Sequence, residues 1–293
     1  MLQAIQFWNE PNNLSHWDYT LDPEWSAFSQ MVLYASREVR REAPGLTQVL
    51  GGLSPLDRDF AELMGRTGVS AAMDVIALHG FPLDWNLWRI NEWPEKIRQM
   101  REITGRTIWV TEVGASSFGA EEVQLFGLQR TAELLTPLVP VIHWYSLIDL
   151  PVHKGAVTRH KESEGSAYYR HFHFGLLRSD ETPKLALRHF RPDLGICQWI
   201  EYEDDDMLEL VCRWLPRLGV RVLRTGISWA DWHRPNSHVW FDRMMSTLSR
   251  FDLTATLCFT PPSRGIVPNH TSPPQDVGEF AYFCWEVARR YGN

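Results

Sequence analysis

The fold expected of this chain is decided by three consecutive segments, Met73–Gly80 (MDVIALHG), Glu92–Thr104 (EWPEKIRQMREIT) and Arg106–Glu112 (RTIWVTE). The first and third are short, nearly continuous apolar runs, as expected of strands that are buried on both faces of a parallel sheet. The second is longer and amphipathic, which is typical of a helix that covers such a sheet. Together they predict two parallel strands joined by a helix.

The same alternation recurs along all 293 residues and predicts eight strand–helix pairs. Eight such units in a chain of this length favour an α/β fold, a single (β/α)₈ or TIM barrel over residues 1–293. A doubly wound sheet would have fewer strands and a glycine-rich phosphate loop after the first, and the sequence has no such loop. The predicted strands are Gln3–Asn9, Thr47–Leu53, Met73–Gly80, Arg106–Glu112, Val139–Ser146, Leu194–Ile200, Gly219–Ile227 and Leu253–Thr260. The predicted helices are Pro23–Ala43, Leu56–Thr67, Glu92–Thr104, Ala120–Thr136, Pro183–Phe190, Asp204–Leu218, Ser237–Phe251 and Asp276–Tyr291.

The composition is that of an ordinary globular protein. Apolar residues make up 44% and charged residues 22%, which argues against disorder, collagen-like repeats and coiled coils. The 29 basic and 36 acidic residues give a net charge of −7 without a basic block, so we expect no nucleic-acid partner. No apolar run approaches the length of about 20 residues that a membrane span needs, so we expect no membrane insertion.

Three further features bear on compartment and ligand. Met1–Phe7 (MLQAIQF) has neither the basic flank nor the long apolar stretch of a signal peptide, which favours a cytoplasmic location. The cysteines are widely spaced and form no C-x-x-C pair, so we expect reduced thiols and neither a disulfide framework nor a zinc site. The 14 tryptophans favour a groove for flat, hydroxyl-rich ligands, although most tryptophans in any protein belong to the core.

Two irregular segments are expected to wall the functional face. Asp149–Thr182 is the longest irregular stretch, and Pro261–Gln275 contains five prolines. Each follows a predicted strand, so in a barrel both lie at the C-terminal ends of the strands, where active sites form. A rigid surface loop is an equally good interpretation of Pro261–Gln275. His171 and His173 alternate without an evident carboxylate or cysteine partner, which favours packing over metal binding.

Two glutamates stand at the ends of apolar strands. Glu10 closes Ile5–Glu10 (IQFWNE), and Glu112 closes Ile108–Glu112 (IWVTE). A carboxylate directly after a buried strand is costly unless it is paired or used in chemistry. On one rim of a barrel, two such groups can cleave a glycosidic bond, one protonating the leaving oxygen and the other attacking the anomeric carbon. The alternative is that each glutamate forms only a salt bridge at the rim.

The motif around Glu10, Trp8–Asn12 (WNEPN), resembles that of the clan-A retaining glycoside hydrolases, which are (β/α)₈ barrels. In that clan the motif ends strand four, and its glutamate is the acid/base. The nucleophile is a glutamate at the end of strand seven, often in a Thr-Glu-x-Gly context, which Thr111–Gly114 (TEVG) matches. Two predicted strands intervene between Glu10 and Glu112, so the strand count agrees with the resemblance.

The resemblance implies roles for four more side chains. Asn9 would bind the sugar 2-hydroxyl, and Trp144, in Ile142–Ser146 (IHWYS), would form the floor of the sugar subsite. Arg224 would hydrogen-bond the nucleophile, where a cation keeps a carboxylate ionised. His79 would lie near the nucleophile. The alternatives are a plain surface arginine and an ordinary buried histidine.

The order of the strands departs from the clan. A clan-A chain begins at strand one, whereas this chain would begin at strand four, run to strand eight and continue with strands one to three. Its last segment, Val287–Asn293 (VARRYGN), resembles the helix end that precedes the Asn-Glu-Pro strand in the clan. We therefore predict a circularly permuted barrel that ends after the third helix. The rival interpretation is a fragment of two tandem barrels.

These features predict a retaining glycoside hydrolase, similar to β-xylosidases, β-glucosidases or cellulases, that acts on an oligosaccharide or small glycoside. Glu10 would be the acid/base and Glu112 the nucleophile, and the chemistry requires neither a metal nor an organic cofactor. A non-catalytic carbohydrate-binding barrel is the alternative. A metal-dependent barrel hydrolase would need convergent histidines and aspartates at several strand ends, which the sequence does not offer. The sugar, the linkage and the oligomeric state stay open.

Overall fold

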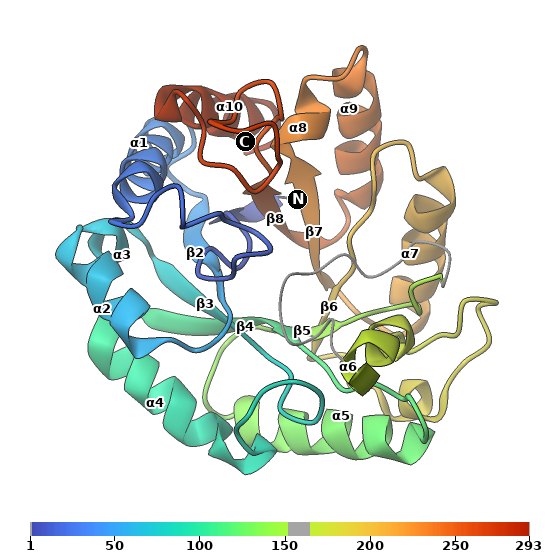
Figure 1. Ribbon diagram of the computed structural model, residues 1–293. Helices are drawn as coiled ribbons and strands as arrows, with labels where there is room; N and C mark the ends of the chain where they lie inside the picture. Colours follow the sequence, from blue (N-terminus) through green and yellow to red (C-terminus); the bar gives the residue numbers. More distant parts are fainter. Residues whose placement is uncertain (1, 152–164, 293) are drawn as a thin grey trace.

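The computed structural model describes residues 2–151 and 165–292. Eight strands pair in parallel in the order of the chain, and the last pairs with the first, so the sheet closes into a barrel with helices around it (Figure 1). The predicted eight-stranded α/β barrel is thereby confirmed. The strands are β1 (Leu2–Phe7), β2 (Thr47–Leu53), β3 (Val75–Gly80), β4 (Thr107–Val113), β5 (Ile142–Tyr145), β6 (Gly195–Cys197), β7 (Val222–Ser228) and β8 (Asp252–Cys258).

The helices agree with the predicted amphipathic segments except after β5. There the segment Pro183–Phe190 forms only a 3₁₀ turn at Leu185–His189, so the prediction of a helix is wrong. The segment is short and Pro192 follows it closely, which disfavours helical propagation. The helices are α1 (Ser26–Glu42), α2 (Arg58–Arg66), α3 (Val69–Ala72), α4 (Trp93–Thr104), α5 (Glu121–Leu135), α6 (Gly165–Arg170), α7 (Asp205–Arg217), α8 (Trp229–Trp232), α9 (Ser237–Leu248) and α10 (Val277–Tyr291).

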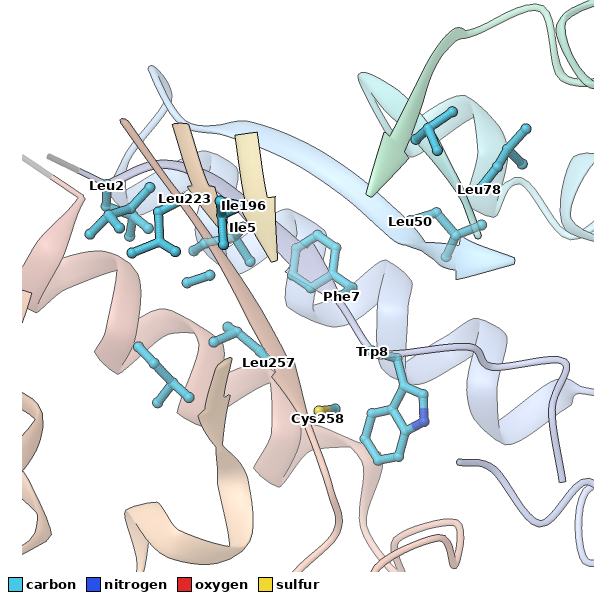
Figure 2. Packing of buried hydrophobic residues seen from close by; sticks show 14 of the residues in the cluster. Leu2, Ile5, Phe7, Trp8, Leu50, Leu78, Ile196, Leu223, Leu257 and Cys258 are labelled. Carbon is cyan, nitrogen blue, oxygen red and sulfur yellow. The ribbon is translucent and has the colours of Figure 1, made fainter. Parts of the chain in front are cut away.

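Successive strand residues belong to two different apolar layers. In β3, Ile76 and Leu78 pack into the main core, which also contains helix residues, whereas Val75 and Ala77 belong to a small separate cluster. The strand is therefore buried on both faces, as its continuous apolar sequence predicts. Figure 2 shows part of the main core, and its labelled side chains include Ile5 of β1, Leu50 of β2, Ile196 of β6 and Leu223 of β7.

The strand register gathers the predicted functional residues at one end of the barrel. His79 and Glu112 are partners across β3 and β4, and each stands next to the last residue of its strand. Glu10 follows the end of β1, and Arg224 of β7 pairs with Cys197, the last residue of β6. Because all strands are parallel, Glu10, His79 and Glu112 lie at the C-terminal rim, where barrel active sites lie. Arg224 stands lower, as the third residue of β7.

Segments beyond the strands complete this rim. The segment Pro261–Gln275 follows β8, and the carbonyl of Thr271 accepts from the backbone N–H of Asp18, which joins it to the segment after β1. The segment Asp149–Thr182 includes residues 152–164, which lie outside the described residues. All four cysteines are free, and Cys197, Cys258 and Cys284 are buried. Over residues 2–151 and 165–292, no helix combines the length and apolarity that crossing a membrane requires.

Candidate active site

The segment after β1 carries Glu10 on strained backbone. Trp8 and Glu10 have φ angles of 66° and 41°, in the left-handed region that residues other than glycine seldom occupy. Such strain persists where surrounding contacts impose it, and it clusters at functional sites. Asn12 provides two of these contacts: its side chain donates to the carbonyl of Pro55 at 2.7 Å and accepts from the N–H of Ser54 at 3.0 Å. The segment is thereby attached to the residues that follow β2.

The carboxylate of Glu10 is nearly buried and contacted at both oxygens. Its Oε1 lies 2.7 Å from Nδ1 of His79, and its Oε2 accepts from the side-chain amide of Asn13 at 2.8 Å. Nδ1 of His16 lies 3.5 Å from the same Oε2. These partners orient a carboxylate that would otherwise be costly to bury. His79 was predicted from the sequence, whereas Asn13 and His16 were not, since their only signal is that they follow Glu10 closely in the chain.

Glu112 faces a buried arginine. Nη1 of Arg224 donates to Oε1 of Glu112 at 2.5 Å, and the arginine side chain is only 3% exposed. The same guanidinium donates to Oδ1 of Asn9 at 2.6 Å and to Oε1 of Gln6 at 3.2 Å. Several acceptors hold the planar fork in one orientation, which lysine could not reproduce. The structure thus brings Glu112, Arg224 and Asn9 together, and it adds Gln6, which the sequence analysis did not identify.

His79 lies between the two carboxylates. Its Nδ1 is 2.7 Å from Oε1 of Glu10 and 3.7 Å from Oε2 of Glu112, and its Nε2 is 3.0 Å from Oγ1 of Thr111. Burial, and next the positive charge of Arg224, holds the pKa of His79 well below its usual value. The imidazole is therefore neutral near neutral pH and bridges the site without adding a charge.

The two carboxylates are close enough to titrate together. One oxygen of Glu10, one oxygen of Glu112 and a ring nitrogen of His79 all lie within 4.8 Å of one another. Burial raises the pKa of Glu112, and the charge of Arg224 opposes that rise. Two largely buried carboxylates at this distance do not readily ionise together, which favours a state in which one of them is protonated. The guanidinium of Arg224 favours the ionised form of Glu112, which it contacts.

Both glutamates open into a pocket of about 350 Å³. That volume is in the range of small-ligand sites, which combine apolar walls with a few convergent polar groups. Asn9 and Arg224 are among its polar lining residues. The aromatic lining residues are Phe81, Trp85, Tyr145, Trp199 and Phe259, together with His16, His171 and His270.

Two pairs of rings form much of the pocket wall. Trp199 and Phe259 meet edge to face with centroids 5.5 Å apart, and Trp85 stacks on His171 with centroids 4.7 Å apart. Gly226 of β7 leaves room for the first pair, since a Cβ at that position would lie 1.8 Å from the ring of Trp199. Flat aromatic faces offer apolar contact to the C–H surfaces of a sugar ring.

Trp144 does not reach this pocket, contrary to what the resemblance implies. Its side chain is fully buried in the main core, whereas the next residue, Tyr145, lines the pocket. Successive residues of a strand point to opposite faces, so the aromatic wall on β5 comes from the residue one position later. Trp85 and Trp199 were also missed. Trp85 lies in the irregular segment after β3, and Trp199 lies within the predicted strand Leu194–Ile200, where nothing local distinguishes it from a core residue.

Glu10, His79 and Glu112 are also a ligand set that metal ions use. Their surroundings argue against that use. The guanidinium of Arg224 lies against Glu112 and would repel a cation at the same oxygens. Nδ1 of His79 is already engaged with Glu10. The donor set therefore fits a proton-sharing carboxylate pair better than a metal centre.

Lys184 is a second buried cation, 2% exposed, and burial lowers its pKa. Its Nζ donates to Oδ1 of Asp149 at 2.6 Å, to Oγ of Ser117 at 2.8 Å and to the carbonyl of His173 at 3.2 Å. These three acceptors use all of the donors of an ammonium group. Lys184 is also absent from the described lining of the pocket. We therefore interpret its role as structural, holding these segments together, and not as that of a nucleophile.

Comparison with known proteins adds little to this geometry. No family model and no curated protein matches the sequence. Among solved structures, a β-glucuronidase from Bacteroides uniformis is 15% identical over 78% of this chain and 26% of that chain, with a TM-score of 0.47. β-Glucuronidase 2 of the same organism, bound covalently to cyclophellitol-6-carboxylate aziridine, is 17% identical over 51% of this chain and 18% of that chain, with a TM-score of 0.39.

A protein of another class is similar to about the same degree. A putative dihydrodipicolinate synthase family protein from Coccidioides immitis is 12% identical over 87% of this chain and 66% of that chain, with a TM-score of 0.40. This chain spans only 18% and 26% of the two β-glucuronidases. Such distant likenesses carry no argument about chemistry, which rests on the residues of the pocket.

Proposed function

We propose that this protein is a retaining β-glycoside hydrolase that acts on oligosaccharides or small glycosides. The observation that carries the proposal is the pair of largely buried carboxylates of Glu10 and Glu112, with oxygens within 4.8 Å of each other in a pocket with aromatic walls. Retaining enzymes hold these groups about 5–5.5 Å apart, and inverting enzymes about 6.5–9.5 Å apart to admit water between. The spacing supports retention.

In the first step Glu112, ionised beside Arg224, attacks the anomeric carbon with a carboxylate oxygen. The bond between that carbon and the glycosidic oxygen breaks, and its electron pair stays on the oxygen. Glu10 transfers its proton to this oxygen, so the aglycone leaves as an alcohol and the sugar is esterified to Glu112. His79 contacts Glu10 as a neutral imidazole. A positively charged imidazole in its place would favour loss of the Glu10 proton before the leaving group needs it.

In the second step Glu10, now ionised, takes a proton from a water molecule. The water oxygen bonds to the anomeric carbon, and the bond to Glu112 breaks with its electron pair returning to the carboxylate. The two inversions restore the original configuration. Arg224 stabilises the returning charge on Glu112, and Asn9, which lines the pocket, is assigned to the sugar 2-hydroxyl. No step needs a metal or an organic cofactor.

Hydrolysis of a panel of aryl β-glycosides, led by β-xylosides and β-glucosides, tests the proposal. Glu10→Gln and Glu112→Gln are each expected to lower kcat/KM by about 10²–10⁴-fold, because a carboxamide neither donates a proton to the leaving group nor attacks. Glu209→Gln, at an exposed position of α7, is the matched control and should keep full activity. The product sugar should first appear as the β-anomer in NMR spectra.

Several results would contradict this assignment. Unchanged turnover in either pocket variant, with a wild-type circular dichroism spectrum, would remove that glutamate from the mechanism. Initial release of the α-anomer would indicate inversion. Sugar binding by the wild-type protein without turnover would favour a non-catalytic carbohydrate-binding barrel, and loss of activity with a chelator would favour a metal-dependent hydrolase.

We also propose that the chain is a circular permutant of the clan-A order. The support is positional: Glu10 follows β1, Glu112 stands on β4 and Arg224 stands on β7, which correspond to strands four, seven and two of the clan. A rearranged chain tests this, with residues 293 and 1 linked and new termini opened before β6 at Pro192. We expect it to keep the circular dichroism spectrum and activity of the original, and loss of the fold would count against the proposal.

A further inference from the structure

A second chamber opens beside the candidate active site. Its volume is about 420 Å³, and Tyr145, Leu150, His171 and Trp199 line both this chamber and the pocket. Cavities that share four wall residues are parts of one cleft. The described lining of the chamber contains neither Glu10 nor Glu112, so whatever part of a ligand it holds lies away from the bond that is cleaved.

The chamber lies on the nucleophile side of the cleft. Its described walls come from the end of β5, from the segment between β5 and β6, from the residues that follow β6 and from the first turns of α7. β5 is the hydrogen-bonded neighbour of β4, the strand that carries Glu112. The leaving group departs past Glu10, which protonates it and which follows β1. The chamber is therefore placed for the part of the substrate on the other side of the cleaved bond.

The wall between the two cavities is held firmly. Oε1 of Gln198 accepts from the N–H of Leu147 at 3.1 Å, and its Nε2 donates to the carbonyl of Trp199 at 3.2 Å. The ring of Trp199 also packs where Gly226 has no side chain. Side chains that are already fixed lose little conformational entropy when a ligand binds, so their contacts add more to affinity than those of mobile side chains. Trp199 lines both cavities, so its position is fixed with respect to each of them.

We propose that this chamber is a donor-side subsite, which binds the sugar unit that precedes the cleaved one. The inference rests on the proposed glycosidase function and narrows its substrate to a β-linked chain or a diglycoside. Trp199 supplies the aromatic face shared by the two sugar units. Asp206 and Ser179, both exposed at the edge of the chamber, supply polar groups for its hydroxyls.

The test compares an aryl β-monoglycoside with the matching aryl β-diglycoside, which share one aryl leaving group. When release of the aryl group is measured, the second sugar of the diglycoside lies on the donor side of the cleaved bond. For the wild-type protein we expect kcat/KM to be about tenfold or more higher for the diglycoside, because remote binding energy lowers the barrier to cleavage. Asp206→Trp and Ser179→Trp fill the chamber from exposed positions, and Glu209→Trp, on α7 but outside the lining, is the control.

Each blocking variant should reduce the ratio of the two kcat/KM values to about one, and Glu209→Trp should leave it at the wild-type value. Three results would overturn the subsite: equal kcat/KM values for both substrates in the wild-type protein, an unchanged ratio in both blocking variants, or the same loss of ratio in Glu209→Trp. Hydrolysis of neither substrate by the wild-type protein would instead refute the proposed function, on which the subsite depends.

Discussion

Replacement of Arg224 by methionine removes the positive charge that faces Glu112 and keeps much of the side-chain length. The guanidinium is almost completely buried, and it donates to Glu112, Asn9 and Gln6. Without it, burial acts on Glu112 unopposed, so the pKa of that carboxyl rises further. The carboxylate needed for attack then forms only at higher pH.

The size of this effect follows from the contact. An opposite charge beside a carboxylate shifts its pKa by about 1–3 units, which corresponds to about 1.4–4 kcal/mol. Since Glu112 must be ionised to attack, the acidic limb of the pH profile of kcat/KM should move to higher pH by about 1–3 units in Arg224→Met. Arg224→Lys keeps the charge but not the planar fork, so it should shift the limb less.

The assay is aryl β-glycoside hydrolysis by the wild-type protein and both variants from acid to alkaline pH. Arg221→Met is the matched control, because Arg221 stands just before β7 with its side chain 79% exposed. Its profile should be that of the wild-type protein. An acidic limb that stays in place in Arg224→Met, or moves to lower pH, would refute the role given to Arg224 and the assignment of Glu112 as the ionised partner.

Two further substitutions probe the barrel interior. Burial, helped by the charge of Arg224, lowers the pKa of His143 to about 3. The pKa of histidine in the unfolded chain is about 6.5, so the free energy of unfolding decreases as the pH is lowered below about 6.5. His143→Leu removes no hydrogen bond to a described residue. In urea unfolding, the free energy of unfolding should differ less between neutral pH and mild acid in this variant than in the wild-type protein. A difference as large as that of the wild-type protein would contradict the prediction. Gly52→Ala places a Cβ 1.9 Å from Nε2 of His79 and should lower kcat/KM about tenfold or more, whereas Gly45→Ala, whose Cβ meets nothing within 4 Å, should not. Equal activity of these two alanine variants would show that catalysis does not depend on the present position of the His79 ring.

The fold was largely predictable because burial periodicity is a local property. The apolar run of β3 and the amphipathic segment of α4 each depend on residues close together in the chain. Failures occur where local pattern is weak. Leu185–His189 forms a 3₁₀ turn in place of a helix, since proline and short length outweigh its apolar spacing.

The candidate site was predictable only in part. Glu10 and Glu112 could be singled out because a carboxylate after a buried strand is unusual. Tyr145 replaced Trp144 at the pocket because one step along a strand exchanges its two faces. Trp85 and His171 come from separate segments, and their stacking depends on how those segments fold over the rim.

The sequence by itself determined the number and order of the strands and the placing of two glutamates at strand ends, because these depend on neighbours in the chain. Only the tertiary structure decided that these carboxylates lie within 4.8 Å of each other, that Arg224 contacts one of them and that a second chamber adjoins their pocket. The physical reason is barrel closure, which brings the residues after β1 together with Glu112 of β4 and Arg224 of β7, although they are far apart along the chain.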